Sequence, residues 1–141
     1  MQTAKIHRPD GAIISCDVQG DAALPPLLLS NSLATTRALW DDMLPELLKE
    51  FRVIRYDTRG HGESQTPNGN TTLGDLANDA VAVLDELKVA RALMVGTLAL
   101  SPCTAEPQPA HMAGASSWQG PGCAVWLLHS GQPCHHTHNL S

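Results

Sequence analysis

The chain has 141 residues, of which 43% are hydrophobic, which is enough for one domain of ordinary size with a buried core. Its net charge of -5 comes from interspersed acidic and basic residues. It therefore lacks the basic stripe that nucleic acid or an anionic membrane surface requires, and we expect a small-molecule partner. Charges at Lys5, Arg8 and Asp10 interrupt the N-terminal residues, and no apolar run reaches the length of a membrane span, so we expect a cytoplasmic protein.

Five strand-like patterns occur in the first two thirds of the sequence. The turn Pro9-Asp10-Gly11 separates two β-type runs and predicts a hairpin. Two later runs are almost continuously apolar, as expected of parallel strands that are covered on both faces. Another run carries β-branched residues at its centre, which favours a strand. We therefore predict strands at residues 3–8, 12–18, 27–30, 51–56 and 92–95.

Helical patterns separate the last three of these strands. Apolar residues over 39–48 are spaced three and four apart and share a face, but Pro45 interrupts them. We predict one short helix before Pro45 and a second that begins close to it, because proline tolerates only the first turn of a helix. A capping box at Thr72 begins a longer helix that runs to about Lys88. We expect the acidic residues of this helix, Asp79 among them, to be mostly solvated.

The composition changes abruptly after the last predicted strand. Residues 101–141 contain one charged residue, Glu106, where ordinary usage of about a quarter would give roughly ten. They show no periodicity, and only 123–128 is apolar enough for an accidental strand. We therefore divide the chain into a partial α/β domain, 1–96, and an irregular or disordered tail, 97–141, which we interpret as out-of-frame sequence.

The predicted order of elements implies a mostly parallel α/β sheet, in which function lies at the carboxyl ends of the strands. Two such ends carry the motifs Leu-Leu-Leu-Ser-Asn-Ser-Leu at 27–33 and Arg-Tyr-Asp-Thr-Arg-Gly-His-Gly-Glu-Ser at 55–64. Together with Trp40-Asp41 and Leu44-Pro45, these motifs resemble the N-terminal part of the α/β-hydrolase superfamily. Within it, the 3-oxoadipate enol-lactonases are most similar. The resemblance covers residues 1 to about 96.

The resemblance implies a serine-type hydrolase of a small carboxylic ester or lactone, of the kind used in aromatic compound catabolism, with no metal or organic cofactor. The backbone N–H of Leu33 would be one donor of the oxyanion hole, in a loop where Asn31-Ser32 replaces the more usual His-Gly pair. In an intact relative, a serine would attack the lactone carbonyl. A histidine would act as base and then activate water, and the product would be ring-opened 3-oxoadipate.

The chain departs from this pattern at the nucleophile elbow, Gly-x-Ser-x-Gly, which should follow the last predicted strand. Gly96 matches the first position, but Leu98 and Leu100 hold the positions of the serine and the second glycine. Ser101 is followed by Pro102 and has no flanking glycine, so an ordinary loop is the better interpretation. No acidic residue follows the histidines near the end of the sequence, so a catalytic acid and histidine are not assembled either. We expect a truncated, inactive relative.

The second motif has a structural interpretation that we prefer to a catalytic one. Gly60 and Gly62 suit a tight turn with positive φ, and Asp57 and Ser64 suit caps of backbone amides. We expect His61 to be a hydrogen-bonded loop residue and not a base.

Two non-catalytic functions stay open. One is a binding or interaction protein that retains the sheet and uses the tail for contacts. Without later strands and helices, residues 92–95 would in either case form an uncovered apolar sheet edge, prone to intermolecular pairing. The other is a metal-binding tail, because thiolate and imidazole are the donors that Zn²⁺ prefers, although no CxxC pair is present. Its ligands would come from Cys123, Cys134, His135, His136 and His138.

Overall fold

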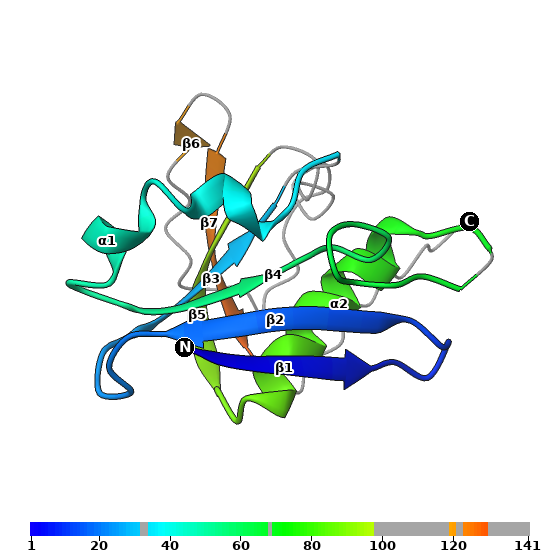
Figure 1. Ribbon diagram of the computed structural model, residues 1–141, viewed down its shortest axis with the longest axis horizontal. Coiled ribbons are helices and arrows are strands. Elements are labelled where there is room, and N and C mark those ends of the chain that lie inside the picture. Colours follow the sequence, from blue (N-terminus) through cyan, green and yellow to red (C-terminus); the bar gives the residue numbers. More distant parts are fainter. Residues whose placement is uncertain (32–33, 68, 98–118, 121–122, 130–141) are drawn as a thin grey trace, which may run out of the picture.

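The computed structural model describes residues 1–31, 34–67, 69–97, 119–120 and 123–129. Within these ranges, seven strands, one 3-10 helix (η1) and two α-helices follow one another along the chain (Figure 1). Their bounds are β1 (Gln2–His7), β2 (Ile13–Gln19), β3 (Pro26–Ser30), η1 (Arg37–Trp40), α1 (Leu44–Leu47), β4 (Arg52–Tyr56), α2 (Leu73–Glu86), β5 (Arg91–Thr97), β6 (Gln119–Gly120) and β7 (Cys123–His129).

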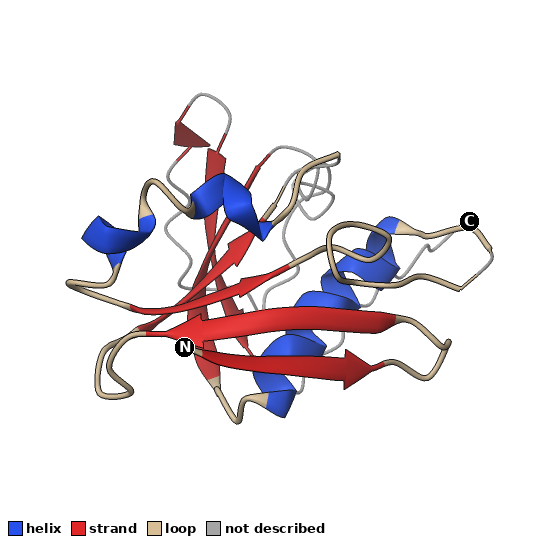
Figure 2. Ribbon diagram, viewed as in Figure 1, coloured by secondary structure: helices blue, strands red, loops and turns tan. Residues whose placement is uncertain are grey.

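The seven strands form one mixed sheet in the order β1-β2-β4-β3-β5-β7-β6 (Figure 2). β1 and β2 form the predicted hairpin, and β2 runs antiparallel to β4. β3 lies between β4 and β5 and is parallel to both. The chain crosses between these parallel strands through η1 and α1 and then through α2, so the predicted α/β class is confirmed.

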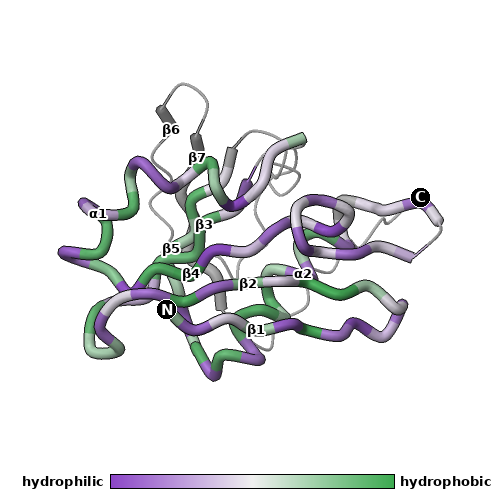
Figure 3. The backbone as a smooth tube through the Cα atoms, viewed as in Figure 1, coloured by the Kyte–Doolittle hydropathy of each residue, from purple (hydrophilic) through white to green (hydrophobic). Residues whose placement is uncertain are grey.

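Helices cover both faces of the central strands. α2 packs on one face, against buried side chains such as Leu28 and Ile54. The η1–α1 segment covers the other face, where Leu29 and Val53 pack against Trp40. Successive residues of a strand point to opposite faces, so a strand covered on both faces can carry consecutive apolar residues, such as Leu27, Leu28 and Leu29 in β3. Figure 3 shows hydrophobic stretches in the central strands. No helix in the described ranges is long and apolar enough to cross a membrane.

Local signals in the sequence determine where the helices begin. Pro45 lies in the first turn of α1, as predicted. The helix before it was expected to end near Asp42 or Met43, but it is a 3-10 helix that begins after the Thr36 cap and ends at Trp40. At the start of α2, the Thr72 hydroxyl accepts a hydrogen bond from the Asp75 N–H at 3.1 Å, and the Asp75 carboxylate accepts one from the Thr72 N–H at 2.8 Å. This is the predicted capping box, which satisfies two amides that the helix itself cannot pair.

The sheet continues beyond β5, so the expected uncovered edge at residues 92–95 is wrong. β7 pairs antiparallel with β5, from His129 opposite Arg91 to Cys123 opposite Thr97. Without a neighbour, β5 would present a row of unpaired backbone N–H and C=O groups. The backbone of β7 pairs with these groups, and its apolar side chains extend the apolar sheet. The apolar run that was predicted as an accidental strand is therefore part of the main sheet. Two further parts of the predicted irregular tail are also in the sheet, since Thr97 ends β5 and Gln119–Gly120 form β6. The remainder of that tail, 98–118, 121–122 and 130–141, lies outside the described residues.

The expectation that Asp79 of α2 is solvated is wrong. Its residue is only 1% exposed, and it lies three positions after Leu76 on the buried stripe. Arg59 binds its carboxylate with two hydrogen bonds, Nε to Oδ2 at 2.7 Å and Nη2 to Oδ1 at 2.8 Å, and Arg8 adds a third. A buried carboxylate needs such partners, and here they tie α2 to the turn that follows β4.

We expect Asp79→Ala to lower the free energy of unfolding by about 3–5 kcal/mol, because the Arg59 guanidinium would stay buried without its bidentate partner. Urea unfolding followed by circular dichroism measures the loss. Asp75→Ala on the same helix is the matched control, and it should cost only about 0.5–2 kcal/mol because it removes a cap at an exposed helix end. Equal losses in the two variants would show that the buried ion pair contributes nothing specific.

Candidate functional site

The carboxyl ends of the three parallel strands lie in one row of the sheet. Ser30 of β3 is in register with Tyr56 of β4 on one side and with Gly96 of β5 on the other. The Ser30 and Tyr56 hydroxyl oxygens are 2.9 Å apart and share a hydrogen bond. The three loops that follow these residues therefore start side by side at one edge, where α/β sheets place their functional groups.

The two positions at which the resemblance implies catalytic groups lie outside the described residues. These are Leu33, the predicted oxyanion donor, and Leu98, at the predicted nucleophile position. The structure does describe residues next to them along the chain. Asn31 and Ala34 flank the first position, and Thr97, the last residue of β5, precedes the second. The described part of the site therefore consists of the loop after β3 and the turn after β4.

Asn31 joins these two segments through its side chain. Its residue is 1% exposed, and its Oδ1 accepts a hydrogen bond from the Thr58 N–H at 3.1 Å. Its Nδ2 donates to the Thr35 carbonyl and lies 3.4 Å from Thr58 Oγ1. A buried amide that bonds backbone groups on both sides fixes where the loop leaves β3. Asn31 lies within the first motif, but no role of its side chain was predicted from the sequence.

His61 bonds the same loop at its other end. Its Nε2 accepts a hydrogen bond from the Ala34 N–H at 2.9 Å. Its Nδ1 lies 3.1 Å from the Arg59 carbonyl oxygen and 3.2 Å from Thr58 Oγ1. A carbonyl can only accept, so the proton of a neutral ring must be on Nδ1 and the lone pair on Nε2. The predicted role of His61, a hydrogen-bonded loop residue, is confirmed.

Ala34 adopts a backbone conformation that alanine rarely takes. Its φ is 62°, in the left-handed region where a side chain costs roughly 1–2 kcal/mol relative to ordinary helical geometry. Surrounding contacts must offset this cost, and the bond from its N–H to His61 is one of them. Backbone strain next to the predicted oxyanion donor is typical of a segment held for function.

The Asp57 carboxylate closes the turn after β4. Its Oδ2 accepts the Glu63 N–H at 3.2 Å, and Ser64 Oγ donates to the Asp57 carbonyl at 2.7 Å. Ser64 Oγ also accepts the Ser15 N–H at 2.8 Å. Gly62, at φ 50°, passes so close that a Cβ would lie 2.5 Å from the Asp57 carboxyl carbon. The predicted structural roles of Asp57, Ser64 and Gly62 are therefore confirmed.

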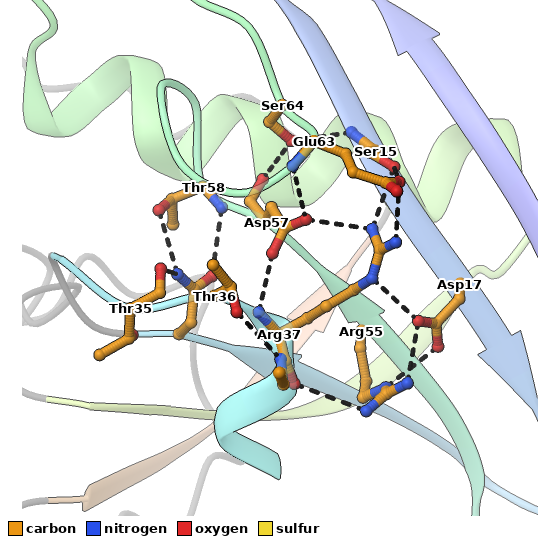
Figure 4. Close-up of polar contacts among 12 residues, drawn as sticks. Ser15, Asp17, Thr35, Thr36, Arg37, Arg55, Asp57, Thr58, Glu63 and Ser64 are labelled. Carbon is orange, nitrogen blue, oxygen red and sulfur yellow. Dashed lines mark hydrogen bonds and ion pairs between the residues drawn. The ribbon is translucent and has the colours of Figure 1, made fainter. Parts of the chain in front are cut away.

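Arg37 connects this turn to the rest of the edge (Figure 4). Its N–H donates to Asp57 Oδ1 at 2.7 Å, and its guanidinium contacts Asp57 at 3.1 Å, Asp17 at 3.1 Å and Glu63 at 2.9 Å. Arg55 binds Asp17 with two bonds of 3.0 Å. The Arg37 hydrogen bond holds the pKa of the Glu63 carboxyl below its usual value. Arg37 was not predicted as a site residue, because no local pattern indicates partners this far away along the chain.

These contacts define what the edge can do chemically. Both ring nitrogens of His61 bond backbone groups, and the Asp57 carboxylate is shared between backbone amides and a guanidinium. The described side chains thus hold two loops in place and do not form a nucleophile–base pair. A fixed loop with backbone N–H donors can stabilise negative charge that develops on a substrate oxygen.

No metal site is found in the part of the chain that the structure describes. No group of three or more His, Cys, Asp and Glu side chains is placed there to hold an ion. Of the predicted zinc ligands, Cys134, His135, His136 and His138 lie outside that part, and the Cys123 side chain is not described.

Burial raises the pKa of the Tyr56 hydroxyl above its ordinary value, because the phenolate would lose its hydration. Tyr56 is the only tyrosine, so tyrosinate absorbance in an alkaline titration reports it alone. We expect no tyrosinate in the folded chain at about pH 11, and a transition near pH 10 in the urea-unfolded chain. The unfolded chain releases this proton first, so the stability linked to Tyr56 is complete below about pH 10 and falls as the pH rises further.

Tyr56→Phe supplies the blank for this titration, because it removes the only phenol. Circular dichroism at each pH shows whether the chain is still folded. Tyrosinate formation near pH 10 in the folded chain would contradict the buried, hydrogen-bonded position of Tyr56.

The chain is similar to known proteins in sequence and in fold. A model of the family described as alpha/beta hydrolase fold matches residues 25–97. The 3-oxoadipate enol-lactonase 1 of Acinetobacter baylyi is 37% identical over 91 residues, which are 64% of this chain and 34% of that protein. The 3-oxoadipate enol-lactonase 2 of the same organism is 40% identical over 77 residues, 55% of this chain and 29% of that protein.

Solved structures agree with these sequence matches. A hydrolase from Pseudomonas aeruginosa superposes with a TM-score of 0.65 at 44% identity, over 67% of this chain and 36% of that one. The enol-lactonase from Burkholderia xenovorans gives a TM-score of 0.62 at 38% identity, over 68% of this chain and 36% of that one. The chain spans about a third of the length of the relatives it matches. On the match of the family model and the shared fold, the chain belongs to the α/β hydrolase family.

Proposed function

We propose that residues 1–96 are the N-terminal part of a serine-type hydrolase of the 3-oxoadipate enol-lactonase kind, whose substrate is a small lactone or ester. One observation carries the proposal. The loop after β3 is bonded at Asn31 and Ala34 to the turn after β4, in the row where three parallel strands end. The similarity to two curated enol-lactonases and to a solved one supports the choice of substrate class. The predicted cytoplasmic location stays a prediction.

In this proposal the chain supplies half of an oxyanion hole. The N–H of Leu33 donates to the lactone carbonyl oxygen as the attack of a serine turns it into an oxyanion. Asn31 and His61 do not touch the substrate, because their polar atoms bond the backbone around this position. No metal or organic cofactor has a part in this chemistry.

We propose further that the chain as it stands has no hydrolase activity. A leucine, Leu98, holds the nucleophile position, and a hydrocarbon side chain has no atom that can attack a carbonyl carbon. Another leucine, Leu100, stands where the sharp turn of the elbow requires glycine. Residues 97–141 are then out-of-frame sequence, and another frame of the coding DNA should encode x-Ser-x-Gly directly after Gly96, which completes the elbow Gly-x-Ser-x-Gly.

Turnover measurements test both parts of the proposal. Purified chain should hydrolyse neither 3-oxoadipate enol-lactone nor p-nitrophenyl acetate above the uncatalysed rate. A hybrid in which residues 1–96 are followed by the corresponding remainder of the A. baylyi enzyme should hydrolyse the enol-lactone. Changing the grafted serine of the hybrid to alanine should remove several orders of magnitude of kcat.

The same hybrid tests the role of Leu33. Leu33→Pro removes the N–H and should lower kcat by about 10²–10³, the usual loss for one oxyanion donor, whereas Leu33→Ala keeps the N–H and should leave kcat nearly unchanged. A folded hybrid without turnover would contradict the proposed function. Turnover by the unmodified chain would contradict its proposed inactivity.

A further inference from the structure

The Ala34 amide and the His61 ring connect two segments that follow different strands. We infer that His61 is a positioning residue that fixes the loop after β3 through Nε2, and that it is neither the base nor the acid of the reaction. This inference deepens the proposed function and rests on it, because only there does the loop carry the oxyanion donor. The contacts that support it join Asn31, Ala34, Thr58, Arg59 and His61, all of which the structure describes.

Two backbone groups of opposite polarity determine the state of the ring. The Arg59 carbonyl faces Nδ1 at 3.1 Å and requires a donor there, while the Ala34 N–H faces Nε2 at 2.9 Å and requires an acceptor. A neutral imidazole has one nitrogen of each kind, on opposite sides of the ring. The ring therefore bridges the turn and the loop, and no lone pair is left to accept a proton from a nucleophile or water.

The turn that carries the ring is itself well fixed. The His61 N–H donates to the Thr58 carbonyl at 3.0 Å, and the Ser64 N–H donates to the His61 carbonyl at 2.9 Å. The Asp57 carboxylate closes the same turn from inside, 2% exposed. His61 is thus held by the end of β4, so its Nε2 presents an acceptor at a set position to a loop that starts from β3.

The loop has features that such an acceptor explains. Ala34 is exposed and has a φ of 62°, so its N–H could bond water in many geometries if no acceptor were fixed. Asn31 holds the other side of the loop through the Thr58 N–H at 3.1 Å, three residues before His61. The loop is therefore attached to one turn at two points, one on each side of the predicted oxyanion donor, Leu33.

Two substitutions of His61 each keep one of the two hydrogen-bonding positions of the imidazole, and they test the inference in the full chain. The amide oxygen of His61→Gln reaches as far as Nε2 and can accept the Ala34 N–H, whereas the shorter side chain of His61→Asn reaches only as far as Nδ1 and Arg59. His61→Ala keeps neither contact. His7→Ala removes an exposed histidine of β1 and serves as the matched control.

Amide hydrogen exchange by NMR gives the readout, with Leu28 at the centre of β3 as internal reference. We expect exchange at Ala34 to accelerate by about tenfold in His61→Ala and His61→Asn, the factor of one hydrogen bond of ordinary net strength. In His61→Gln and His7→Ala it should stay within about twofold of the unmodified chain, and exchange at Leu28 should not change in any variant. The ¹⁵N spectrum of the ring should show a protonated Nδ1 and an unprotonated Nε2.

The following results would overturn the inference. They are unchanged exchange at Ala34 in His61→Ala, equal effects of the Gln and Asn variants, and a protonated Nε2 in the unmodified chain. If Ala34 and Leu28 accelerated together, His61 would be a general stabiliser, which also contradicts a positioning role. These outcomes do not depend on turnover, so they separate a failure here from a failure of the proposed enol-lactonase activity, which the hybrid reports.

Discussion

The Asp57 carboxylate is the group on which this edge of the sheet depends. It follows β4 directly, and its two oxygens accept the N–H groups of Arg37 and Glu63 at 2.7 Å and 3.2 Å. The first bond fixes the start of η1, where the loop after β3 ends, and the second closes the turn after β4. Because the residue is 2% exposed, water does not compete for these bonds. One side chain thus sets the spacing of the two loops.

Two arginine clusters attach the helical layers to the end of the same strand. Arg37 belongs to η1, and through Asp17 it shares a carboxylate with Arg55 of β4. Arg59, just after β4, binds Asp79 of α2. The segment that begins at the end of β4 is therefore joined by charge-assisted bonds to the helices on both faces of the sheet. Such buried pairs cost desolvation, so they specify geometry more than they add stability.

Features that depend on neighbours in the sequence could be predicted. Pro45, the capping box at Thr72 and the turn role of Gly62 each follow from residues a few positions apart. Features that depend on distant partners could not. The spacing of Asp79 from Leu76 places it beside the buried stripe of α2, but nothing within α2 identifies its partner, Arg59, which is 20 residues away. Likewise, the apolar run of β7 contains no signal that it pairs with β5 or runs antiparallel to it. At the site, the role of His61 was predicted, but not which amide it binds.

The central position of β3 has a consequence for the order in which the sheet can form. Ser30 pairs with Tyr56, 26 residues along the chain, and also with Gly96, which emerges from the ribosome only after the whole of α2. Closing such long loops lowers the entropy of the chain before the contacts between the strands contribute any favourable free energy. Non-local parallel pairing therefore slows folding. During synthesis one side of β3 stays open until β5 arrives, and the row of strand ends is therefore among the last features of the parallel core to be completed.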